Sequence, residues 1–318
     1  MFSSANIAYV KWDMNRIFSD YYSKYLKAQG RPQGETAHRY VMALGRIMRT
    51  LTERFPHILF EGCAAGGNRF DLGILCYFPQ IWASDNTDAV SRAYIQEGLS
   101  YGYPMSTVSA HVSACPNHQT LRVTPLSTRF NVAAFGICGY ECNLVDMSRS
   151  ERSEIKTQID IYKKWRHAMQ FGSFYRQRTG NIHQWTVVDE EAGRAVGLIM
   201  QELVRANTQN EEYYAAGLDP EAVYSFYNRP LKHNVKEFGD LINTVAPIHI
   251  RQGSLLHGMV AKFVTMPGET EKYELSGSML MNCGVRLKQA FAATGFSEEV
   301  RHFPDFASRL YFMEKISD

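Results

Sequence analysis

Short apolar runs alternate with helical patterns through the first 150 residues, and this rhythm constrains the fold more than any other feature. Apolar residues at helical spacing predict helices over 35–54, before Pro56, and over 87–99. The runs between and around them predict strands at 7–11, 57–61, 80–83, 108–113 and 142–145. Strands that alternate with helices indicate a parallel sheet or a barrel.

The pattern changes after a long charged segment, which predicts a helix over 150–168. Beyond it, apolar runs are separated by turn residues, as in antiparallel β-structure. We expect strands at 183–188, 195–206, 255–265 and 272–279, with a hairpin turn at 191–194. The sequence therefore predicts an α/β unit over residues 1–170 and an all-β unit, an antiparallel β-sandwich, over residues 171–318.

Composition excludes several classes of partner. The net charge of +2 gives no strong field for polyanions, so nucleic acid is not expected. The N-terminus has no signal-peptide pattern and no apolar run reaches 18 residues, so no membrane association is expected. Six scattered cysteines do not form a disulfide framework; we interpret them as reduced thiols and predict a cytoplasmic location.

Acidic side chains follow predicted parallel strands, where a barrel places its active site. Asp13 ends the first strand, and Asp85 follows the third. Two carboxylates that face each other across a sugar are what glycoside hydrolysis needs. The same pattern is typical of helix caps, metal ligands and solvated loop charges, and Asp85 or Asp88 as a helix N-cap is an equal alternative.

Other motifs give weaker signals. Cys63, beside a pair of glycines, could be a nucleophilic thiol or part of a phosphate loop, but no matching His or Lys-Ser/Thr accompanies it. Cys138 and Cys142 lack a second pair of ligands, so no metal is expected. His111 and His118 are more typical of loop or core histidines than of ligands.

At these positions the sequence resembles the bacterial α-galactosidases of glycoside hydrolase family 36. Residues 9–16 (Tyr-Val-Lys-Trp-Asp-Met-Asn-Arg) resemble the family's nucleophile strand, and residues 80–90 resemble its acid/base segment. Residues 59–73 (Leu-Phe-Glu-Gly-Cys-Ala-Ala-Gly-Gly-Asn-Arg-Phe-Asp-Leu-Gly) resemble its substrate loop. Residues 110–120 and 281–285 (Met-Asn-Cys-Gly-Val) match as well, so the resemblance covers nearly the whole chain.

The resemblance implies a retaining α-galactosidase that acts on terminal α-linked galactose in oligosaccharides such as raffinose and melibiose. It assigns the nucleophile to Asp13 and the general acid/base to Asp85, with their carboxyl groups about 5–5.5 Å apart. It implies no metal or organic cofactor. The family often forms homotetramers, so a homo-oligomer is expected.

The resemblance also implies a substrate-binding set. Lys11 is expected to bind galactose hydroxyls, and Cys63 with its neighbours Ala65 and Gly66 to shape the pocket. Trp82 is expected to support the acid/base strand, with packing alone as an equal alternative. Ala65 is a departure from the family, because it adds a methyl group where close approach of the backbone to the sugar is expected.

The chain departs from the family most at its start, because only twelve residues precede Asp13. In the family, several barrel strands and an N-terminal β-sandwich come before the nucleophile. A complete (β/α)8 barrel takes about 250 residues, so residues 1–170 are expected to form only its C-terminal half. The alternatives are α-N-acetylgalactosaminidase activity, galactosyl transfer on the same scaffold, or an inactive fragment.

Overall fold

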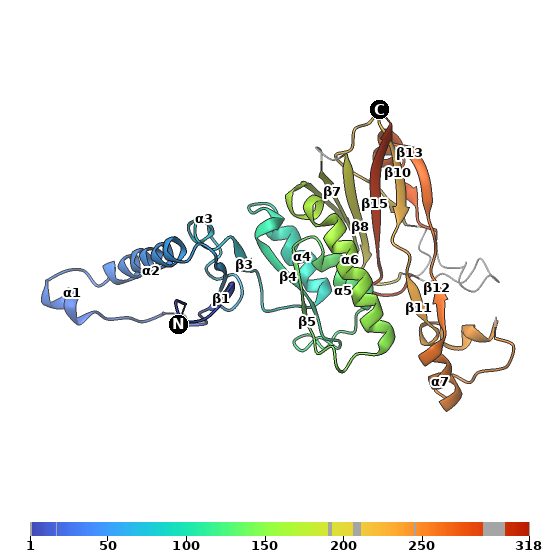
Figure 1. Cartoon of the computed structure of the whole chain (residues 1–318), viewed down its shortest axis with the longest axis horizontal. Coiled ribbons are helices and arrows are strands. Elements are labelled where there is room, and N and C mark those ends of the chain that lie inside the picture. Colours follow the sequence, from blue (N-terminus) through green and yellow to red (C-terminus); the bar gives the residue numbers. More distant parts are fainter. Residues whose placement is uncertain are drawn as a thin grey trace.

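The polypeptide forms a parallel α/β unit followed by an antiparallel β unit (Figure 1). The computed structural model describes residues 2–16, 18–189, 193–205, 211–244, 246–288 and 303–317, without the side chains of residues 244 and 317. The turn expected at 191–194 includes residues 191 and 192, which lie outside the described residues.

A five-stranded parallel sheet occupies the first unit, with its strands side by side in chain order. The strands are β1 (Tyr9–Asp13), β2 (Leu59–Cys63), β3 (Gln80–Trp82), β4 (Val108–Ser113) and β5 (Ile137–Glu141). The first four predicted strands are confirmed, with β1 and β2 ending two residues later than expected.

The predicted strand at 142–145 is wrong, because these residues form the loop after β5. In that loop the Asn143 side-chain oxygen accepts the backbone N–H of Val145 at 3.2 Å. This local hydrogen bond favours a turn over an extended strand. The true strand contains Gly139, whose missing side chain leaves room for His111: a Cβ there would lie 2.8 Å from the imidazole.

Helices connect these strands. The prediction for α2 (Glu35–Arg54) is confirmed at both ends, and α4 (Ala89–Leu99) begins two residues late because Asp88 caps it. The long charged helix α6 (Arg149–Phe171) begins with a capping box formed by Ser148 and Glu151. The shorter helices are α1 (Lys24–Ala28), α3 (Leu72–Leu75), η1 (Met105–Thr107) and α5 (Leu126–Ala133).

A six-stranded antiparallel sheet forms the second unit, in the order β13-β10-β15-β8-β7-β6. Its strands are β6 (Ser173–Thr179), β7 (Ile182–Asp189), β8 (Arg194–Gln201), β10 (Val223–Asn228), β13 (Lys272–Ser276) and β15 (Ser308–Ser317). Two strand pairs stand apart from it: β9 (Glu212–Tyr213) with β14 (Val285–Arg286), and β11 (Lys232–Asn234) with β12 (Thr265–Pro267).

Three β predictions in this unit need correction. The segment 255–265 is mainly the helix α7 (Leu255–Phe263), capped by the Ser254 hydroxyl, which accepts the His257 N–H at 3.1 Å. The strand expected over 272–279 ends at Ser276, which caps α8 (Gly277–Asn282). The strand expected over 195–206 ends at Gln201. The 3-10 segment η2 (Val235–Thr244) was not predicted.

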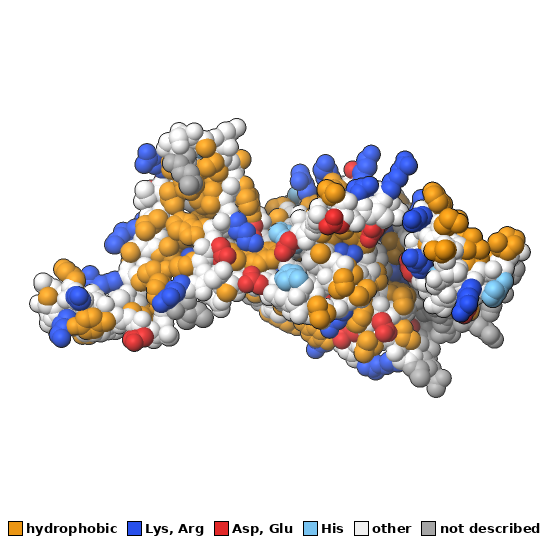
Figure 2. Space-filling model, turned by 90° about the horizontal axis from the view of Figure 1, so that it is seen from below, with side chains coloured by type: hydrophobic (Ala, Val, Ile, Leu, Met, Phe, Trp, Pro, Cys, Tyr) orange, Lys and Arg blue, Asp and Glu red, His pale blue; other side chains and the backbone are white. Residues whose placement is uncertain are grey.

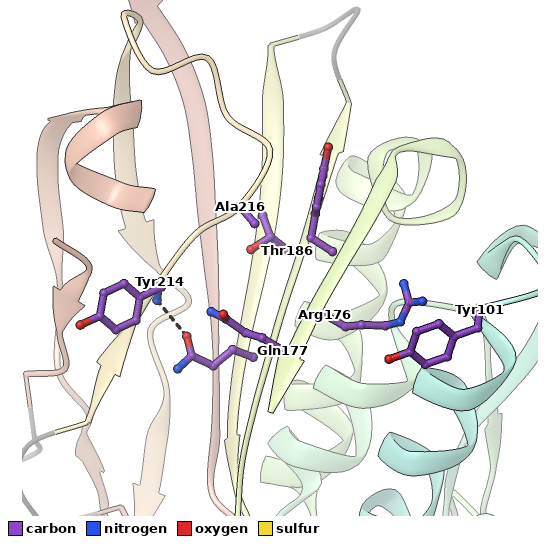
Figure 3. A pocket seen from close by; sticks show the side chains of 8 residues that line it. Tyr101, Arg176, Gln177, Thr186, Tyr214 and Ala216 are labelled. Carbon is purple, nitrogen blue, oxygen red and sulfur yellow. Dashed lines mark hydrogen bonds between the residues drawn. The ribbon is translucent and has the colours of Figure 1, made fainter. Parts of the chain in front are cut away.

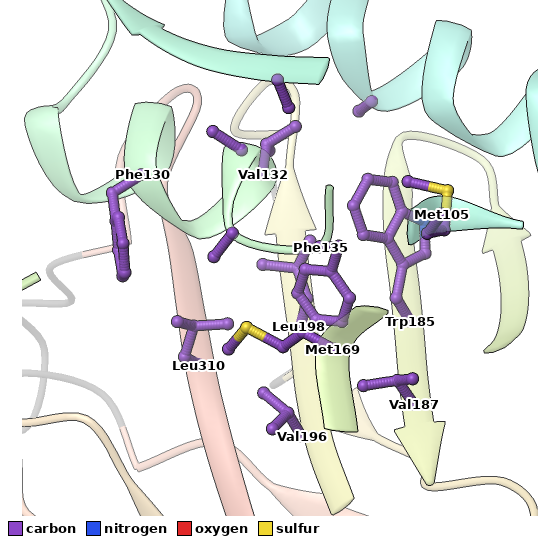
Figure 4. Close-up of a cluster of buried hydrophobic side chains, with 14 of the residues drawn as sticks. Met105, Phe130, Val132, Phe135, Met169, Trp185, Val187, Val196, Leu198 and Leu310 are labelled. Carbon is purple, nitrogen blue, oxygen red and sulfur yellow. The ribbon is translucent and has the colours of Figure 1, made fainter. Parts of the chain in front are cut away.

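One hydrophobic core joins the two units (Figure 4). It contains Val108 and Phe135 from the first unit and Trp185 and Leu198 from the sheet of the second. Helix α6 closes it, with the Trp165 ring stacked on Phe312 at 4.8 Å between centroids. The opposite face of the six-stranded sheet carries a second core beneath β9, β14 and α8.

Hydrophobic side chains also gather on the outer surface of the N-terminal end of the molecule (Figure 2, left). The α2 residues Val41, Met42 and Ile47 are each more than half exposed. Strand β1 pairs with β2 alone among the described strands, so one edge of the parallel sheet is open. Among the described residues, no helix is both long enough and apolar enough to span a membrane.

Candidate active site

One face of the parallel sheet is polar, and we call it the polar face. Alternation along β1 puts Tyr9, Lys11 and Asp13 on this side, while Val10 and Trp12 pack against the α2 side. The strand register places Lys11 opposite Glu61 and Asp13 opposite Cys63. Because all five strands run in parallel, their carboxyl ends meet at one edge, which is where Asp13 and Cys63 lie.

Glu61 links the first four strands across the polar face. Its carboxylate lies 3.7 Å from the Lys11 ammonium and accepts hydrogen bonds from the Tyr9 hydroxyl and, at 2.8 Å, from Gln80. Gln80 also donates to the Ser109 hydroxyl at 2.8 Å. Glu61 is 1% exposed, and this burial raises the pKa of its carboxyl group to about 7.

Trp82 connects the polar face to Asp85. Its ring is 4% exposed and lies beneath the Lys11 ammonium, 4.0 Å from the ring centroid. Its indole N–H donates to the Asp85 carboxylate at 3.0 Å. Trp82 is therefore in contact with both a predicted sugar-binding residue and the predicted acid/base, beyond any contribution to packing.

Arg92 fixes the loop that carries Asp85. This guanidinium is 2% exposed and donates to the carbonyls of Ser84 at 2.6 Å, Asn86 at 2.8 Å and Ser109 at 3.1 Å. It also lies over the Trp82 ring, 4.5 Å from the centroid. Burial lowers the pKa of Arg92 to about 10, so the group stays charged at neutral pH.

Asp13 is tied to the loop after β2. Its carboxylate accepts from the Asn15 amide at 3.1 Å, and the Asn15 oxygen accepts the backbone N–H of Ala65 at 2.7 Å. The Cys63 thiol lies beside it. Burial, and then the hydrogen bond to Asp13, raise the pKa of Cys63 to about 11, so the thiol is protonated at neutral pH and is not an activated nucleophile.

Gly66 brings the loops after β2 and β3 into contact. Its φ is +78°, and a Cβ there would lie 2.8 Å from Ser84 Cα and 3.2 Å from the Asp85 nitrogen. The close backbone approach is thus at Gly66, while Ala65 is exposed. Ala65 has a φ of +47°, which is unfavourable for a residue with a side chain.

The two acidic residues of the third loop have different positions. Asp88 is the N-cap of α4, accepting from the Ser91 N–H at 3.0 Å, and it forms an ion pair with Arg122. Asp85 does not cap the helix and is exposed at the sheet edge, as is Asp13. The capping alternative therefore holds for Asp88 and is wrong for Asp85.

All seven predicted site residues lie at the carboxyl edge of the polar face or in the loops that follow it: Lys11, Asp13, Cys63, Ala65, Gly66, Trp82 and Asp85. Our sequence analysis missed Asn15, Gln80 and Arg92, and assigned no role to Glu61. The two-residue alternation of the strands carries a signal for Glu61 and Gln80, because both share a face with Lys11.

His111 lies on this face as well, on β4 and not in a loop. Its ring lies 4.4 Å from that of Trp82, and its Nδ1 is 3.3 Å from the Glu141 carboxylate. Burial lowers the pKa of His111 in spite of that carboxylate. Within the described ranges, no three His, Cys, Asp or Glu side chains are grouped so that they could hold a metal ion.

Two family models match the chain. The Melibiase model matches residues 1–172, and the model of the glycosyl hydrolase family 36 C-terminal domain matches residues 182–313. Curated relatives include α-galactosidase AgaA of Geobacillus stearothermophilus, which is 46% identical over 225 residues. α-Galactosidase 1 of Pediococcus pentosaceus is 44% identical over 227 residues. Each of these alignments covers 70% of this chain and 31% of the relative.

Solved structures of α-galactosidases are similar to this chain as well. The α-galactosidase from Lactobacillus brevis superimposes with a TM-score of 0.78 at 33% identity, covering 100% of this chain and 37% of that protein. A substituted AgaA from G. stearothermophilus in complex with raffinose superimposes with a TM-score of 0.74 at 35% identity. This match covers 99% of this chain and 36% of that protein. The chain thus spans about a third of the length of the relatives that it matches.

Fold and site together define a class: part of a barrel-type glycoside hydrolase, joined to its C-terminal β domain. The chain belongs to glycoside hydrolase family 36, the family of the matched α-galactosidases. The predicted fold class, a partial barrel followed by an antiparallel β domain, is confirmed.

Proposed function

We propose that this chain supplies the two catalytic carboxylates of a retaining α-galactosidase, with Asp13 as nucleophile and Asp85 as acid/base. The observation that carries the proposal is the contact of Gly66 with the backbone of Ser84 and Asp85. This contact, with the bridge from Asp13 through Asn15 to Ala65, connects the two carboxylates through one short loop. Both side chains are exposed at the edge where a barrel binds substrate.

The proposed reaction has two steps. In the first, Asp85 gives its proton to the glycosidic oxygen as the C1–O bond breaks, and a carboxylate oxygen of Asp13 bonds to C1. In the second, water attacks C1 and gives a proton to Asp85, while the bond to Asp13 breaks. Two inversions at C1 release galactose in the α configuration.

The remaining residues position the sugar and the acid/base. We propose that Lys11 binds galactose hydroxyls, because Glu61 and the Trp82 ring fix its ammonium at the polar face. Cys63, Ala65 and Gly66 would form the wall of the pocket beside Asp13. Trp82 would orient Asp85 through its indole N–H.

The proposed substrates are α-galactosides such as raffinose and melibiose. Solved relatives of this chain include AgaA variants in complex with raffinose and with stachyose. Matched aryl glycosides of galactose and N-acetylgalactosamine separate the two specificities. Faster release of the acetamido sugar would overturn the proposal of a galactosidase.

The decisive experiment places residues 1–318 after the N-terminal part of the Geobacillus AgaA, so that the barrel strands that precede β1 are supplied. We expect Asp13→Asn to reduce hydrolysis of an aryl α-galactoside by at least about a thousandfold. The control is Asp20→Asn, which changes an exposed aspartate shortly after β1 and should leave the rate unaltered. Equal rates in the Asp13→Asn and unsubstituted forms would exclude Asp13 as nucleophile.

The isolated chain tests the alternative of an inactive fragment. The open edge of β1 and the exposed Lys11 and Asp13 favour little turnover by residues 1–318 alone, so the assay is run on both the isolated chain and the fusion.

The proposal also includes a domain boundary at residues 170/171, a homo-oligomer and a cytoplasmic location. Limited proteolysis, sedimentation and cell fractionation test these three points.

A further inference from the structure

A groove of about 340 Å³ lies at the edge strand β6 of the antiparallel sheet, and we call it the β6 groove (Figure 3). It wraps around this edge, because Arg176 and Tyr101 lie on one face of the sheet and Tyr175 and Gln177 lie on the other. Tyr101, which follows α4, stands at one end, and Tyr214, next to β9, stands at the other. None of the eight side chains that line the groove is acidic. The groove contains neither Asp13 nor Asp85, so it is separate from the proposed active site.

Three tyrosine rings provide its aromatic surface, and two of them pack against glycines whose missing side chains leave room for the rings. A Cβ on Gly217 would lie 2.1 Å from the Tyr175 ring, and one on Gly284 would lie 2.9 Å from the Tyr214 ring. The third ring, Tyr101, is 79% exposed. The groove therefore offers flat apolar faces, of which the Tyr175 and Tyr214 rings are packed against backbone before a ligand arrives.

Several polar groups of the groove have no partner within the described part of the chain. No hydrogen bond holds the hydroxyls of Tyr101 and Tyr175 or the amide of Gln177, and the buried Nε of Arg176 is also without an acceptor. The Arg176 guanidinium stacks over the Tyr101 ring at 3.7 Å from its centroid, which leaves its N–H groups available in the plane.

Gln184 differs from Gln177, its neighbour across the strand pair. The Gln184 oxygen accepts the Tyr214 backbone N–H at 2.8 Å, and its amide donates to the Glu212 carbonyl at 3.0 Å. Gln184 thus belongs to the wall of the groove. Gln177 presents both a donor and an acceptor to the interior.

We propose that the β6 groove is a second saccharide-binding site. Its paired donors and acceptors match the hydroxyl groups of a neutral sugar, and its tyrosine faces match the C–H faces of a sugar ring. The volume lies at the lower end of the range for small-ligand pockets, about 300–1,000 Å³, and accommodates a short saccharide. A peptide strand added to β6 is less favoured, because charged side chains at Arg176 and Arg178 protect this edge.

The test is calorimetric titration of the Asp13→Asn form of residues 1–318 with raffinose and with stachyose. This form cannot turn over substrate by the proposed mechanism, so the measurement does not depend on whether the chain is active. We expect saturable binding that weakens about fivefold to tenfold in Tyr101→Ala and in Gln177→Ala. Tyr25→Ala changes another exposed tyrosine, on α1 at the other end of the molecule; it is the matched control and should keep the affinity.

Lys11→Ala removes the sugar contact proposed for the polar face, so binding that remains in this variant and weakens in the two groove variants belongs to the groove. Absence of saturable binding would overturn the proposal, as would an affinity that is unchanged in both groove variants. A change in oligomeric state in Tyr101→Ala by sedimentation, without sugar binding to the parent, would assign the groove to protein contacts instead. Circular dichroism confirms that each variant is folded.

Discussion

The indole nitrogen of Trp82 donates a hydrogen bond to the carboxylate of Asp85 at 3.0 Å, three residues further along the chain. The same ring carries the Lys11 ammonium on β1, 4.0 Å from its centroid. One buried side chain thus contacts Lys11 on β1 and Asp85 in the loop after β3, two strands that are separated by β2. Replacing Trp82 by an aromatic residue without an N–H, and comparing it with the same change at a packing tryptophan, separates orientation of Asp85 from packing.

Trp82→Phe keeps an aromatic ring under Lys11 but removes the hydrogen bond to Asp85. We expect kcat to fall about tenfold in the fusion of residues 1–318 to the N-terminal part of AgaA, with KM changed less than twofold. The reason is that a misoriented acid/base slows proton transfer. Trp12→Phe is the matched control, since Trp12 lies on the opposite face against Phe78. An equal fall in kcat in both variants would assign the effect to loss of packing.

Gly66→Ala should displace the loop that carries Asp85. The new methyl group would lie 2.8 Å from Ser84 Cα at a φ of +78°, so steric overlap adds to the cost of a left-handed alanine. We expect a loss of about 2–4 kcal/mol in the free energy of unfolding, measured with urea. The control Gly30→Ala has a similar φ of +62° but no atom within 4 Å, and it should lose only about 1 kcal/mol.

Glu61 should make stability depend on pH. Its pKa rises from 4.5 to about 7 in the folded protein, so between these values the folded state keeps a proton that the unfolded state releases. The free energy of unfolding should therefore fall as pH rises from about 4.5 to about 7, by up to about 3 kcal/mol. Urea titrations at several pH values measure this slope. Glu61→Gln should flatten it, and Glu53→Gln, at an exposed position of α2, should not.

The shared core should make the two units unfold together. Trp165 of α6 is 2% exposed and stacks on Phe312 of β15. Trp165→Ala should cost about 3–5 kcal/mol, while Trp165→Phe should cost less because it leaves a smaller cavity. Unfolding followed by circular dichroism and by tryptophan fluorescence should give one coincident transition. Two separate transitions in the unsubstituted chain would contradict this coupling.

Helix α7 shows where a correct pattern was assigned to the wrong structure. The apolar residues Leu255, Met259 and Phe263 recur every four positions, which is a helical period, and Ser254 supplies an N-cap. The sequence therefore contains a helical signal at this segment, although the segment lies among antiparallel strands. At β5 the strand lies before the predicted segment and includes Gly139, whose role beside His111 depends on the neighbouring strand.

The sequence by itself determined the first four strands of the parallel sheet, the extent of α2, and the positions of Asp13 and Asp85 at or just after strand ends. These features depend on local periodicity, capping and short motifs, all of which are encoded within a few neighbouring residues. The seven predicted site residues lie within three strand-end motifs that resemble the family, and their roles stay predictions.

Only the tertiary structure decided what these residues contact. Burial of Glu61, the contact of Arg92 with Trp82 and the approach of Gly66 to Ser84 join residues from different strands and loops. Which of Asp85 and Asp88 caps α4, and which stays exposed at the sheet edge, likewise depends on where α4 begins. Such contacts depend on strand register and packing across the sheet, and no local pattern specifies them.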